Sequence, residues 1–309
     1  MVICMGSGSM VVKIEMFGLK LPEIKPGDDL VRLILDEASR TAGGIKDGDI
    51  IVVTSKIVSK AYNFLIKLDE VEPSKEAYKL AKKLNMDPRF IQAVLDQSDE
   101  ILFVFPFYEL VKEGIISLEK ISKNVAEAYE ALKRIPYMLV VRRGNQIYTD
   151  AGLDFSNNPE GILSALPKNL DKIAKEIRRK IFELTGKDVA VVISDTEMWL
   201  SLGSLDFARG SSGIEVVSKN FGELDLYGKP KFGGVDHVAH EIACAAALLM
   251  GQTAKGIPAV IIRGCQYQRS EEGISNYQID LENVREIIKK IIKCSIKTLG
   301  LKWLLKILK

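Results

Sequence analysis

The sequence predicts a mixed α/β (α+β) protein, and three observations lead to this class. Asp49–Thr54 and Val189–Ser194 are short β-branched runs between polar residues, which is typical of buried strands. Leu170–Thr185 repeats its apolar residues at the helical period and stops before Gly186. Such strands and helices alternate along most of the chain, which favours an α/β or mixed α+β fold.

The remaining elements are assigned from the same signals. Asp28 or Asp29 can cap a helix that runs to about Arg40, ahead of the pair Gly43-Gly44. We expect further helices at Ser74–Leu84, Pro88–Gln97, Leu118–Arg134 and Asp236–Leu249, and from Leu281 onward. We expect further strands at Val11–Met16, Ile101–Phe105, Tyr137–Val141, Gln146–Tyr148 and Ala259–Ile262. A turn-rich polar loop lies at Thr149–Glu160, and a Gly/Ser-rich stretch at Ser201–Gly213.

Composition limits the kind of protein and its partners. The 309 residues include 43 basic and 41 acidic ones, so a nucleic-acid partner, which needs a basic excess, is not expected. No run of eighteen apolar residues occurs, so neither a transmembrane helix nor a membrane partner is expected. The four cysteines, Cys4, Cys244, Cys265 and Cys294, form no CxxC pair, which favours free thiols and a cytoplasmic location.

The chain divides into three parts. Residues 1–9 are interpreted as a tag or other non-native extension, with the folded chain beginning near Met10. Residues 10–280 are expected to form the α/β body, as one large domain or as two lobes. Residues 281–309 are expected to form a basic amphipathic helix. We expect this helix to pack on the body or on a second subunit, with contact to a membrane surface as the alternative.

Three polar groups follow predicted strands: Ser55-Lys56, the Asp150–Asn157 loop and Asp195-Thr196. Ligands of open α/β sheets gather beyond the carboxyl ends of strands. The oxygen ligands of Asp154 and Asp195 suit Mg²⁺ or Mn²⁺ rather than zinc. Such an ion would bridge nucleotide phosphates, whose charge Lys56 and Lys60 could neutralise. The alternatives are a solvated turn at Ser55-Lys56 and a helix cap or turn at Asp195-Thr196.

Other motifs are absent or ambiguous. No GxxxxGK[ST] motif occurs, and no GxGxxG follows a strand, so a P-loop or Rossmann protein is not expected. His237 and His240 lie three residues apart near the start of a predicted helix, where they share a face with Cys244. A metal, acid–base or purely structural role is open for this pair.

The ordered set of segments resembles the coenzyme F420-0:L-glutamate ligases, the γ-glutamyl ligases of deazaflavin biosynthesis. The resemblance covers about Val11 to Gly264. It is carried by Leu21-Pro22-Glu23-Ile24, Gly48 to Lys60, Phe90 to Leu95, Asp150 to Asn157, Ile193-Ser194-Asp195-Thr196, Asp225-Leu226-Tyr227-Gly228, Leu249-Met250-Gly251 and Gly256-Ile257-Pro258-Ala259-Val260. Each segment alone is weak, whereas the ordered set is specific.

The resemblance implies a two-lobed archaeal enzyme that forms an intertwined homodimer and binds GTP without a P-loop. GTP would phosphorylate the carboxylate of F420-0, and the amine of L-glutamate would then attack the acyl phosphate to form an amide. Carried over by motif, the nucleotide contacts are Leu21, Pro22, Glu23, Ile24, Ser55, Lys56, Lys60, Asn157, Met250, Gly251, Gln252, Gly256 and Ile257. The metal ligands for Mg²⁺ or Mn²⁺ are Asp154, Asp195, Thr196 and Gln252, and K⁺ is an additional option. No catalytic residue is assigned.

The chain departs from the family pattern at the acceptor and metal sites. After Asp195-Thr196 the family carries Gly-Arg and a second Arg, whereas this chain has Glu197 to Gly203 without arginine. Tyr62-Asn63-Phe64 replaces a Glu-Gly-Arg, and Gln252 replaces an acidic metal ligand. His240 replaces an Asp, and the region of Leu118–Arg134 is an insertion. Arg209 stands where the family carries Ile and could compensate for a lost arginine.

Three hypotheses remain open on the sequence. The first is a working F420-0 ligase with altered acceptor contacts. The second is a divergent amide ligase, or another nucleotide- and metal-dependent enzyme, that acts on a different carboxylate. The third is a non-catalytic protein that keeps only the fold. Trp199 is the residue expected to distinguish them, if its side chain fills the acceptor space.

Overall fold

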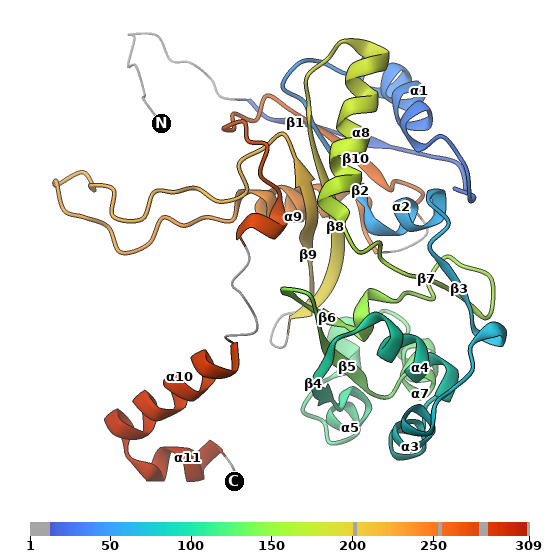
Figure 1. The fold of residues 1–309 in the computed structure, drawn as a ribbon, viewed down its shortest axis with the longest axis vertical. Helices are drawn as coiled ribbons and strands as arrows, with labels where there is room; N and C mark the ends of the chain where they lie inside the picture. The colour runs from blue at the N-terminus through green and yellow to red at the C-terminus, as the bar shows by residue number, and fades with distance from the viewer. Residues whose placement is uncertain (1–12, 200–202, 253–254, 278–283, 308–309) are drawn as a thin grey trace. The chain divides into compact units, whose positions relative to one another are not determined.

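The computed structural model describes residues 13–199, 203–252, 255–277 and 284–307 (Figure 1). They belong to two compact units. Of the described residues, those within 13–65, 154–159 and 164–274 form unit 1, and those within 66–153, 160–163, 275–277 and 284–307 form unit 2. Helices and strands alternate in both, which confirms the mixed α/β class. Within these ranges no helix combines the length and the apolar character that crossing a bilayer requires.

Unit 1 is a five-stranded sheet in the order β1-β10-β2-β8-β9. The strands are β1 (Glu15–Leu19), β10 (Ala259–Arg263), β2 (Ile50–Thr54), β8 (Ala190–Trp199) and β9 (Gly203–Ser212). β2 and β8 are parallel, and the other neighbours are antiparallel. Helices α1 (Leu30–Ala42) and α8 (Leu170–Thr185) contact each other on one face, and α9 (Val238–Met250) packs on the other (Figure 1). Both faces are covered, which explains why residues 50–53 of β2 and 190–193 of β8 form continuous buried apolar runs.

Unit 2 contains a three-stranded antiparallel sheet of β4 (Glu100–Phe105), β5 (Met138–Arg143) and β6 (Gln146–Thr149). Its helices are α3 (Lys75–Leu84), α4 (Pro88–Gln97), α5 (Phe107–Lys112), α6 (Leu118–Ile121), α7 (Val125–Arg134), α10 (Val284–Leu299) and α11 (Leu301–Ile307). A small core of Val111, Leu118 and Leu132 holds α5, α6 and α7 together. The short strands β3 (Leu65–Lys67) and β7 (Ile162–Ser164) pair where the chain passes between the units.

Several helices begin and end where the sequence predicts. Asp29 caps α1 by accepting a hydrogen bond from Arg32 N at 3.2 Å, and Gly43 ends the helix in the left-handed conformation. Helix α8 spans Leu170–Thr185 as predicted and ends at Gly186 with φ of 68°. These ends are set by local caps, which explains why the sequence alone locates them.

Four expectations were wrong in length or continuity. Leu118–Arg134 is not one helix, because the chain leaves the helical conformation at Ser122 and Asn124 caps α7 anew. The helix expected from Leu281 onward is interrupted at Gly300, whose φ is 79°. The strand expected to end at Ser194 continues to Trp199, because β9 pairs with its whole length. Of the strand expected at Val11–Met16, β1 begins at Glu15, while residues 1–12, including the proposed tag, lie outside the described residues.

Candidate active site

Helix α2 (Ser55–Ala61) places two serines and two lysines at the carboxyl end of β2. It begins directly after the strand, so Ser55 and Ser59 lie one turn apart, as do Lys56 and Lys60. Ser59 Oγ donates to Ser55 O at 3.0 Å, and both serines are buried. The alternative of a solvated turn at Ser55-Lys56 is therefore wrong.

The loop that follows Leu153 is fixed by its own hydrogen bonds. Asp154 and Ser164 form an isolated antiparallel bridge with N···O distances of 3.0 and 2.9 Å. Asp154 Oδ1 accepts from Ser156 N at 2.7 Å, and Asn158 Nδ2 donates to Asp154 O at 3.0 Å. Asn157 has a φ of 55°, a left-handed conformation that asparagine tolerates. The Asp154 carboxylate is thus held in a pre-formed turn.

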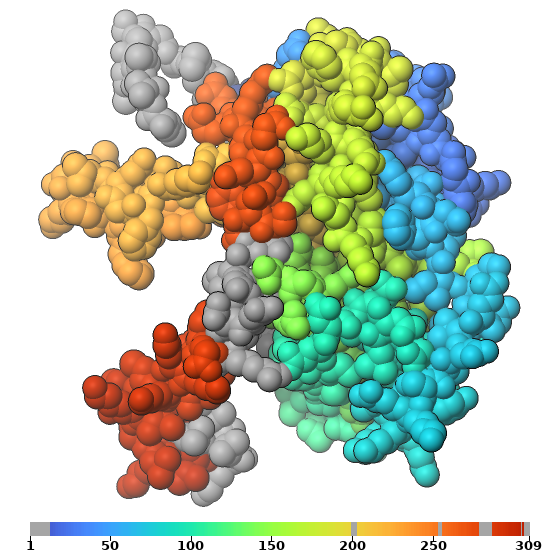
Figure 2. All heavy atoms as spheres, in the orientation of Figure 1, coloured from blue at the N-terminus to red at the C-terminus, as the bar shows by residue number. Residues whose placement is uncertain are grey.

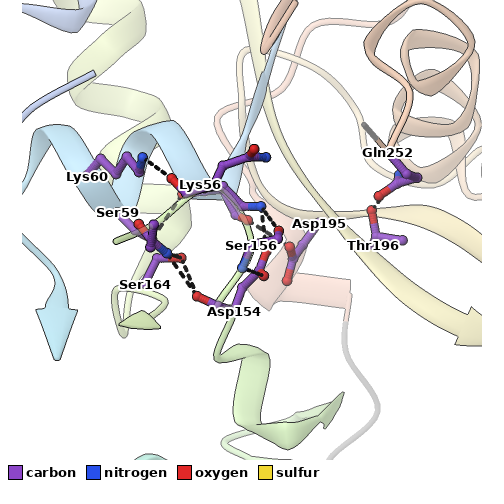
Figure 3. Close-up of polar contacts among 12 residues, drawn as sticks. Lys56, Ser59, Lys60, Asp154, Ser156, Ser164, Asp195, Thr196 and Gln252 are labelled. Carbon is purple, nitrogen blue, oxygen red and sulfur yellow. Dashed lines mark hydrogen bonds and ion pairs between the residues drawn. The ribbon is translucent and has the colours of Figure 1, made fainter. Parts of the chain in front are cut away.

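Both lysines of α2 reach this loop (Figure 3). Lys56 Nζ lies 2.7 Å from Asp154 Oδ2 and also donates to Ser156 Oγ. Lys60, a buried lysine, donates from Nζ to Asn157 O at 2.5 Å. Positive charge is therefore concentrated between α2 and the 154–158 loop, with one carboxylate beside it.

A second carboxylate joins the group from β8. Because β8 runs parallel to β2, Asp195 lies beside the start of α2, and Ser55 Oγ donates to Asp195 Oδ1 at 2.7 Å. Burial raises the pKa of Asp195 to about 7; the charge of Arg209 opposes this shift, whereas Glu197 and Asp154 add to it. Asp195 lies inside a strand, so the alternative of a cap or turn is wrong here.

Thr196 points away from Asp195, because successive side chains of a strand alternate between the two faces. Thr196 Oγ1 donates to Asp206 Oδ1, its cross-strand partner, at 2.8 Å. Gln252 Nε2 donates to Thr196 Oγ1 at 2.9 Å and to Asp206 Oδ1 at 3.1 Å. Burial raises the pKa of Asp206, and the two hydrogen bonds oppose the shift. Figure 3 shows Thr196 and Gln252 as a pair apart from Asp154 and Asp195.

A β-bulge brings a buried ion pair next to Asp195. Ile193 pairs with Gly210 and Ser194 with Ala208, so Arg209 is the extra residue of β9. Its guanidinium pairs with Glu197, and both side chains are buried, with 8% and 12% of their surface exposed. Arg209 Cζ also lies 6.0 Å from the ring centroid of Phe207. The one arginine that could compensate for the family's lost arginines is thus already paired within the chain.

The segments expected to contact the nucleotide adjoin one another. Leu21 N donates to Gly256 O at 3.1 Å, and Thr54 N donates to Pro258 O at 2.9 Å. A Cβ atom on Gly18 would lie 2.9 Å from Ile257 Cγ2, so β1 and this loop approach closely. Leu21, Ile24 and Met250 are buried, whereas Pro22, Glu23, Gln252 and Gly256 are exposed and Gly251 and Ile257 half-buried. Residues 253–254 lie outside the described residues.

The two histidines stack on each other at the start of α9. Their ring centroids are 3.4 Å apart with planes inclined by 9°. His240 Nδ1 accepts a hydrogen bond from Ala208 N at 3.1 Å, which ties α9 to β9. Burial lowers the pKa of His240 to about 3, with His237 and Arg209 adding to the shift. Cys244 donates from Sγ to Asp206 O at 3.1 Å. These contacts support a structural role for the pair.

The structure brings most of the predicted site together within unit 1. Asp154, Asp195, Ser55 and Lys56 form one connected group, and Thr196 and Gln252 form another. Asp150 belongs to unit 2, where its Oδ1 accepts from Leu139 N at 2.8 Å. Among the described residues, no three His, Cys, Asp or Glu side chains are grouped closely enough to hold a metal ion alone. A divalent ion would therefore need hydroxyl, water or substrate oxygens in addition to Asp154 and Asp195. The assigned ligand roles stay predictions.

The sequence analysis missed two residues of the candidate site. Asp206 lies in a Gly/Ser-rich stretch that shows no strand pattern, and only its pairing with Thr196 reveals it. Ser164 supports Asp154 through the bridge and through Ser164 Oγ, which donates to Asp154 O at 3.2 Å. The side chain of Trp199, expected to decide between the hypotheses, lies outside the described residues.

Comparison with known proteins places the chain in a family. Residues 18–264 match the model of the F420-0:γ-glutamyl ligases. The coenzyme F420:L-glutamate ligase of Archaeoglobus fulgidus is 36% identical over 284 residues, which cover 91% of this chain and 99% of that protein. The enzymes of the same name from Methanocaldococcus jannaschii and Methanopyrus kandleri are 35% and 34% identical, covering 82% and 78% of this chain and 88% and 83% of their own lengths. The match extends over most of both chains, so this protein belongs to the F420-0:γ-glutamyl ligase family.

Proposed function

We propose that the protein is a GTP- and metal-dependent γ-glutamyl ligase that joins L-glutamate to the carboxylate of F420-0. Family membership supports an amide-forming ligase. The contacts between α2, the 154–158 loop and Asp195 support the proposed dependence on GTP and a metal ion. This cluster is the observation that carries the proposal, because it combines two lysines with two carboxylates next to the point where the parallel pairing of β2 and β8 ends.

The proposed reaction has two steps. A carboxylate oxygen of the acceptor attacks the γ-phosphorus of GTP, forming an acyl phosphate and releasing GDP. The amine nitrogen of glutamate then attacks the acyl carbon, the C–O bond to phosphate breaks, and the nitrogen loses a proton as the amide forms. Phosphorylation is needed because a free carboxylate is a poor electrophile.

The roles of this chain's residues follow from their charge. Lys56 and Lys60 hold the 154–158 loop in the described contacts, and the same ammonium groups are placed to neutralise phosphate oxygens. Ser55 orients Asp195 through its hydrogen bond. The segments around Leu21 and Gly256 would contact the nucleotide base and sugar.

The residues present fit a divalent ion. Asp154 and Asp195 supply hard oxygen ligands, and burial raises the pKa of Asp195, so a bound cation would stabilise the charged form of this carboxylate. Gln252 is a weaker candidate ligand, because its amide donates hydrogen bonds to Thr196 and Asp206. When bound, Mg²⁺ or Mn²⁺ would offset the negative charge that develops during phosphoryl transfer.

A product assay tests this proposal. Purified protein is incubated with GTP, Mn²⁺, L-glutamate and F420-0. The products are separated, and their masses are determined by mass spectrometry. We expect a product heavier by one glutamyl residue together with GDP in equal amount. Omission of Mn²⁺, or replacement of GTP by ATP, should remove most of the product. GDP binding without any glutamylated product would overturn the F420-0 assignment.

A second candidate is a ligase for a different carboxylate. The Glu197–Arg209 pair supports it, because a paired guanidinium offers less attraction to an anionic acceptor than a free one. This candidate predicts GTP hydrolysis coupled to glutamate only when another carboxylic acid is supplied. A panel of carboxylic acids in the same assay separates the two candidates. Absence of nucleotide binding in the presence of Mn²⁺ would favour a non-catalytic protein.

We further propose a homodimer that is joined by the arm at residues 218–236. The arm is a hairpin with hydrogen bonds such as Asp225 N to Lys229 O at 2.8 Å and Lys231 N to Glu223 O at 2.9 Å. It stands out from unit 1 in Figures 1 and 2. Its large apolar side chains are exposed: Phe221, Leu224, Leu226, Tyr227, Phe232 and Val235. Such a surface is typical of a protein–protein interface.

Sedimentation measurements test the arm. We expect the wild-type chain to sediment as a dimer and the double variant Leu226→Glu/Phe232→Glu as a folded monomer. Phe182→Glu, at an exposed position of α8, serves as the control and should remain dimeric. A dimer that persists in the double variant would contradict the proposed interface.

A further inference from the structure

The C-terminal pair of helices carries a row of exposed apolar side chains. Helices α10 and α11 are separated by Gly300, whose φ of 79° allows the sharp change of direction visible in Figure 1. Along α10 the exposed residues recur at helical spacing, and α11 continues the series. They are Ile287, Ile288, Ile291, Ile292, Leu299, Leu301 and Leu305, with 38–61% of their surface exposed.

Positive charge accompanies this row without any acidic residue. From Ile287 to Lys309 the sequence contains seven lysines and no Asp or Glu. They are Lys289, Lys290, Lys293, Lys297, Lys302, Lys306 and Lys309. At 3.6 residues per turn, the four lysines of α10 lie on the side opposite the isoleucines. The only acidic residue of the two helices is Glu286, which pairs with Lys289 at 2.7 Å.

We propose that α10 and α11 adsorb to an anionic lipid surface. A helix with an apolar stripe, a lysine-rich opposite face and low overall hydrophobicity is suited to lie in the interfacial plane of a bilayer. Trp303 in α11 is of the residue type that gathers at this interface, and lysine side chains can extend from a buried stripe to the headgroups. The inference concerns surface adsorption, not a span, and it replaces the expectation that the protein has no membrane partner.

Charge decides between an anionic lipid surface and the other occupants of this face. Pairing with the same segment of a second copy would cover the isoleucine row but leave both sets of lysines in solvent without an anionic partner. A nucleic acid would use the lysines but leave the isoleucine row uncovered. An anionic bilayer satisfies both halves of the helix, because its headgroups attract lysine and its acyl region accepts isoleucine.

Vesicle co-sedimentation with the full chain tests the proposal. One set of vesicles contains phosphatidylglycerol mixed with phosphatidylcholine, and the other contains phosphatidylcholine alone. We expect binding to the first set, with an apparent affinity that falls at least tenfold as salt is raised from low to physiological strength. Ile291→Glu should reduce this binding at least tenfold. Ile115→Glu, at a similarly exposed isoleucine in unit 2, is the matched control and should bind like the wild type.

Each other outcome counts against the proposal. Failure of the folded wild type to bind anionic vesicles would overturn it, as would unchanged binding by Ile291→Glu. Equal binding to both vesicle types would show that the lysines do not recognise anionic headgroups, which contradicts the proposal. A change in sedimentation or in melting temperature caused by Ile291→Glu, without vesicle binding by the wild type, would assign the face to a protein contact instead. None of these results depends on the ligase activity.

Discussion

The two halves of the candidate site differ in how their charges are arranged. On the side of α2 and the 154–158 loop, the lysines belong to segments that resemble the family pattern; Lys56 pairs with Asp154, and Lys60 donates to Asn157 O. On the side of the β8–β9 hairpin, the one arginine is paired with Glu197 in a segment that departs from the family. Under the proposed function, phosphoryl transfer and the choice of acceptor would be carried by separate segments, which could diverge independently.

Removing charge from the α2 side should have the largest effect. We expect Asp154→Asn to reduce kcat/KM for GTP-dependent product formation by about 10²–10³-fold, because the proposed divalent ion, which would offset the developing negative charge, loses a charged ligand. Steady-state assays over a Mn²⁺ series measure it. Glu130→Gln, an exposed carboxylate on α7, is the control and should leave activity unchanged. Wild-type activity in Asp154→Asn would refute the proposed role of this half.

On the hairpin side, the contact of His240 with β9 should make the stability of the protein decrease at acid pH. The pKa of His240 falls from 6.5 to about 3 on folding, so the unfolded chain binds more protons between these values and stability decreases as pH falls below 6.5. From pH 7 to pH 5 we expect a loss of about 2 kcal/mol from this residue alone. Because the raised pKa of Asp195 acts in the opposite direction over the same range, urea unfolding at both pH values must compare the wild type with a His240 variant.

The variant His240→Gln isolates this contribution. Its amide oxygen can accept from Ala208 N but does not titrate, so its stability should depend less on pH than that of the wild type. If both proteins lose the same free energy of unfolding between pH 7 and pH 5, His240 is not the source of the acid sensitivity.

The α2 side was also the part that the sequence could predict. The strands β2 and β8 are β-branched runs, and the polar residues at their ends could be placed together by the general rule for parallel sheets. The hairpin was not predictable in this way. β9 is rich in glycine and serine, and it is a strand because β8 pairs with it and because α8 comes close to it. A Cβ on Gly210 would lie 2.5 Å from Leu170 C, so the glycine is explained by tertiary contact.

The helix ends and the interruptions also differ in how well the sequence predicts them. Asp29 and Gly43 are local signals, and they located α1 correctly. The break between α6 and α7 depends on Asn124 competing with a continuous apolar period, and sequence reasoning gave the period too much weight. The bulge at Arg209 shifts the register by one residue, which no periodicity of β9 reveals.

Freeing Arg209 should alter acceptor preference by an intermediate amount. In Glu197→Gln the guanidinium loses the charge of this partner, so more of its attraction would act on an acceptor carboxylate or phosphate. We expect kcat/KM for an anionic acceptor to rise about tenfold, the equivalent of one charge-assisted hydrogen bond, relative to a neutral one. Competition assays with paired acceptors measure the ratio. An unchanged ratio would show that the hairpin does not select the acceptor.

The smallest effect is expected at Gln252, where a substitution tests whether a metal ion binds near this residue. In Gln252→Glu a carboxylate would replace the amide that donates to Asp206, and two like charges would face each other. Without divalent ions we expect a loss of stability of about 1 kcal/mol, because a buried acceptor loses its donor. With Mn²⁺ the added acidic ligand should reverse the loss, since a cation between the carboxylates turns repulsion into coordination.

Thermal unfolding of Gln252→Glu with and without Mn²⁺ measures both terms, and Gln252→Ala is the matched control. The alanine variant also removes the donor but adds no carboxylate, so Mn²⁺ should not restore its stability. Equal recovery of both variants would mean that the ion acts elsewhere, at Asp154 and Asp195. Recovery of the glutamate variant alone would indicate that an ion binds on the Asp206 side of β8, apart from Asp154 and Asp195.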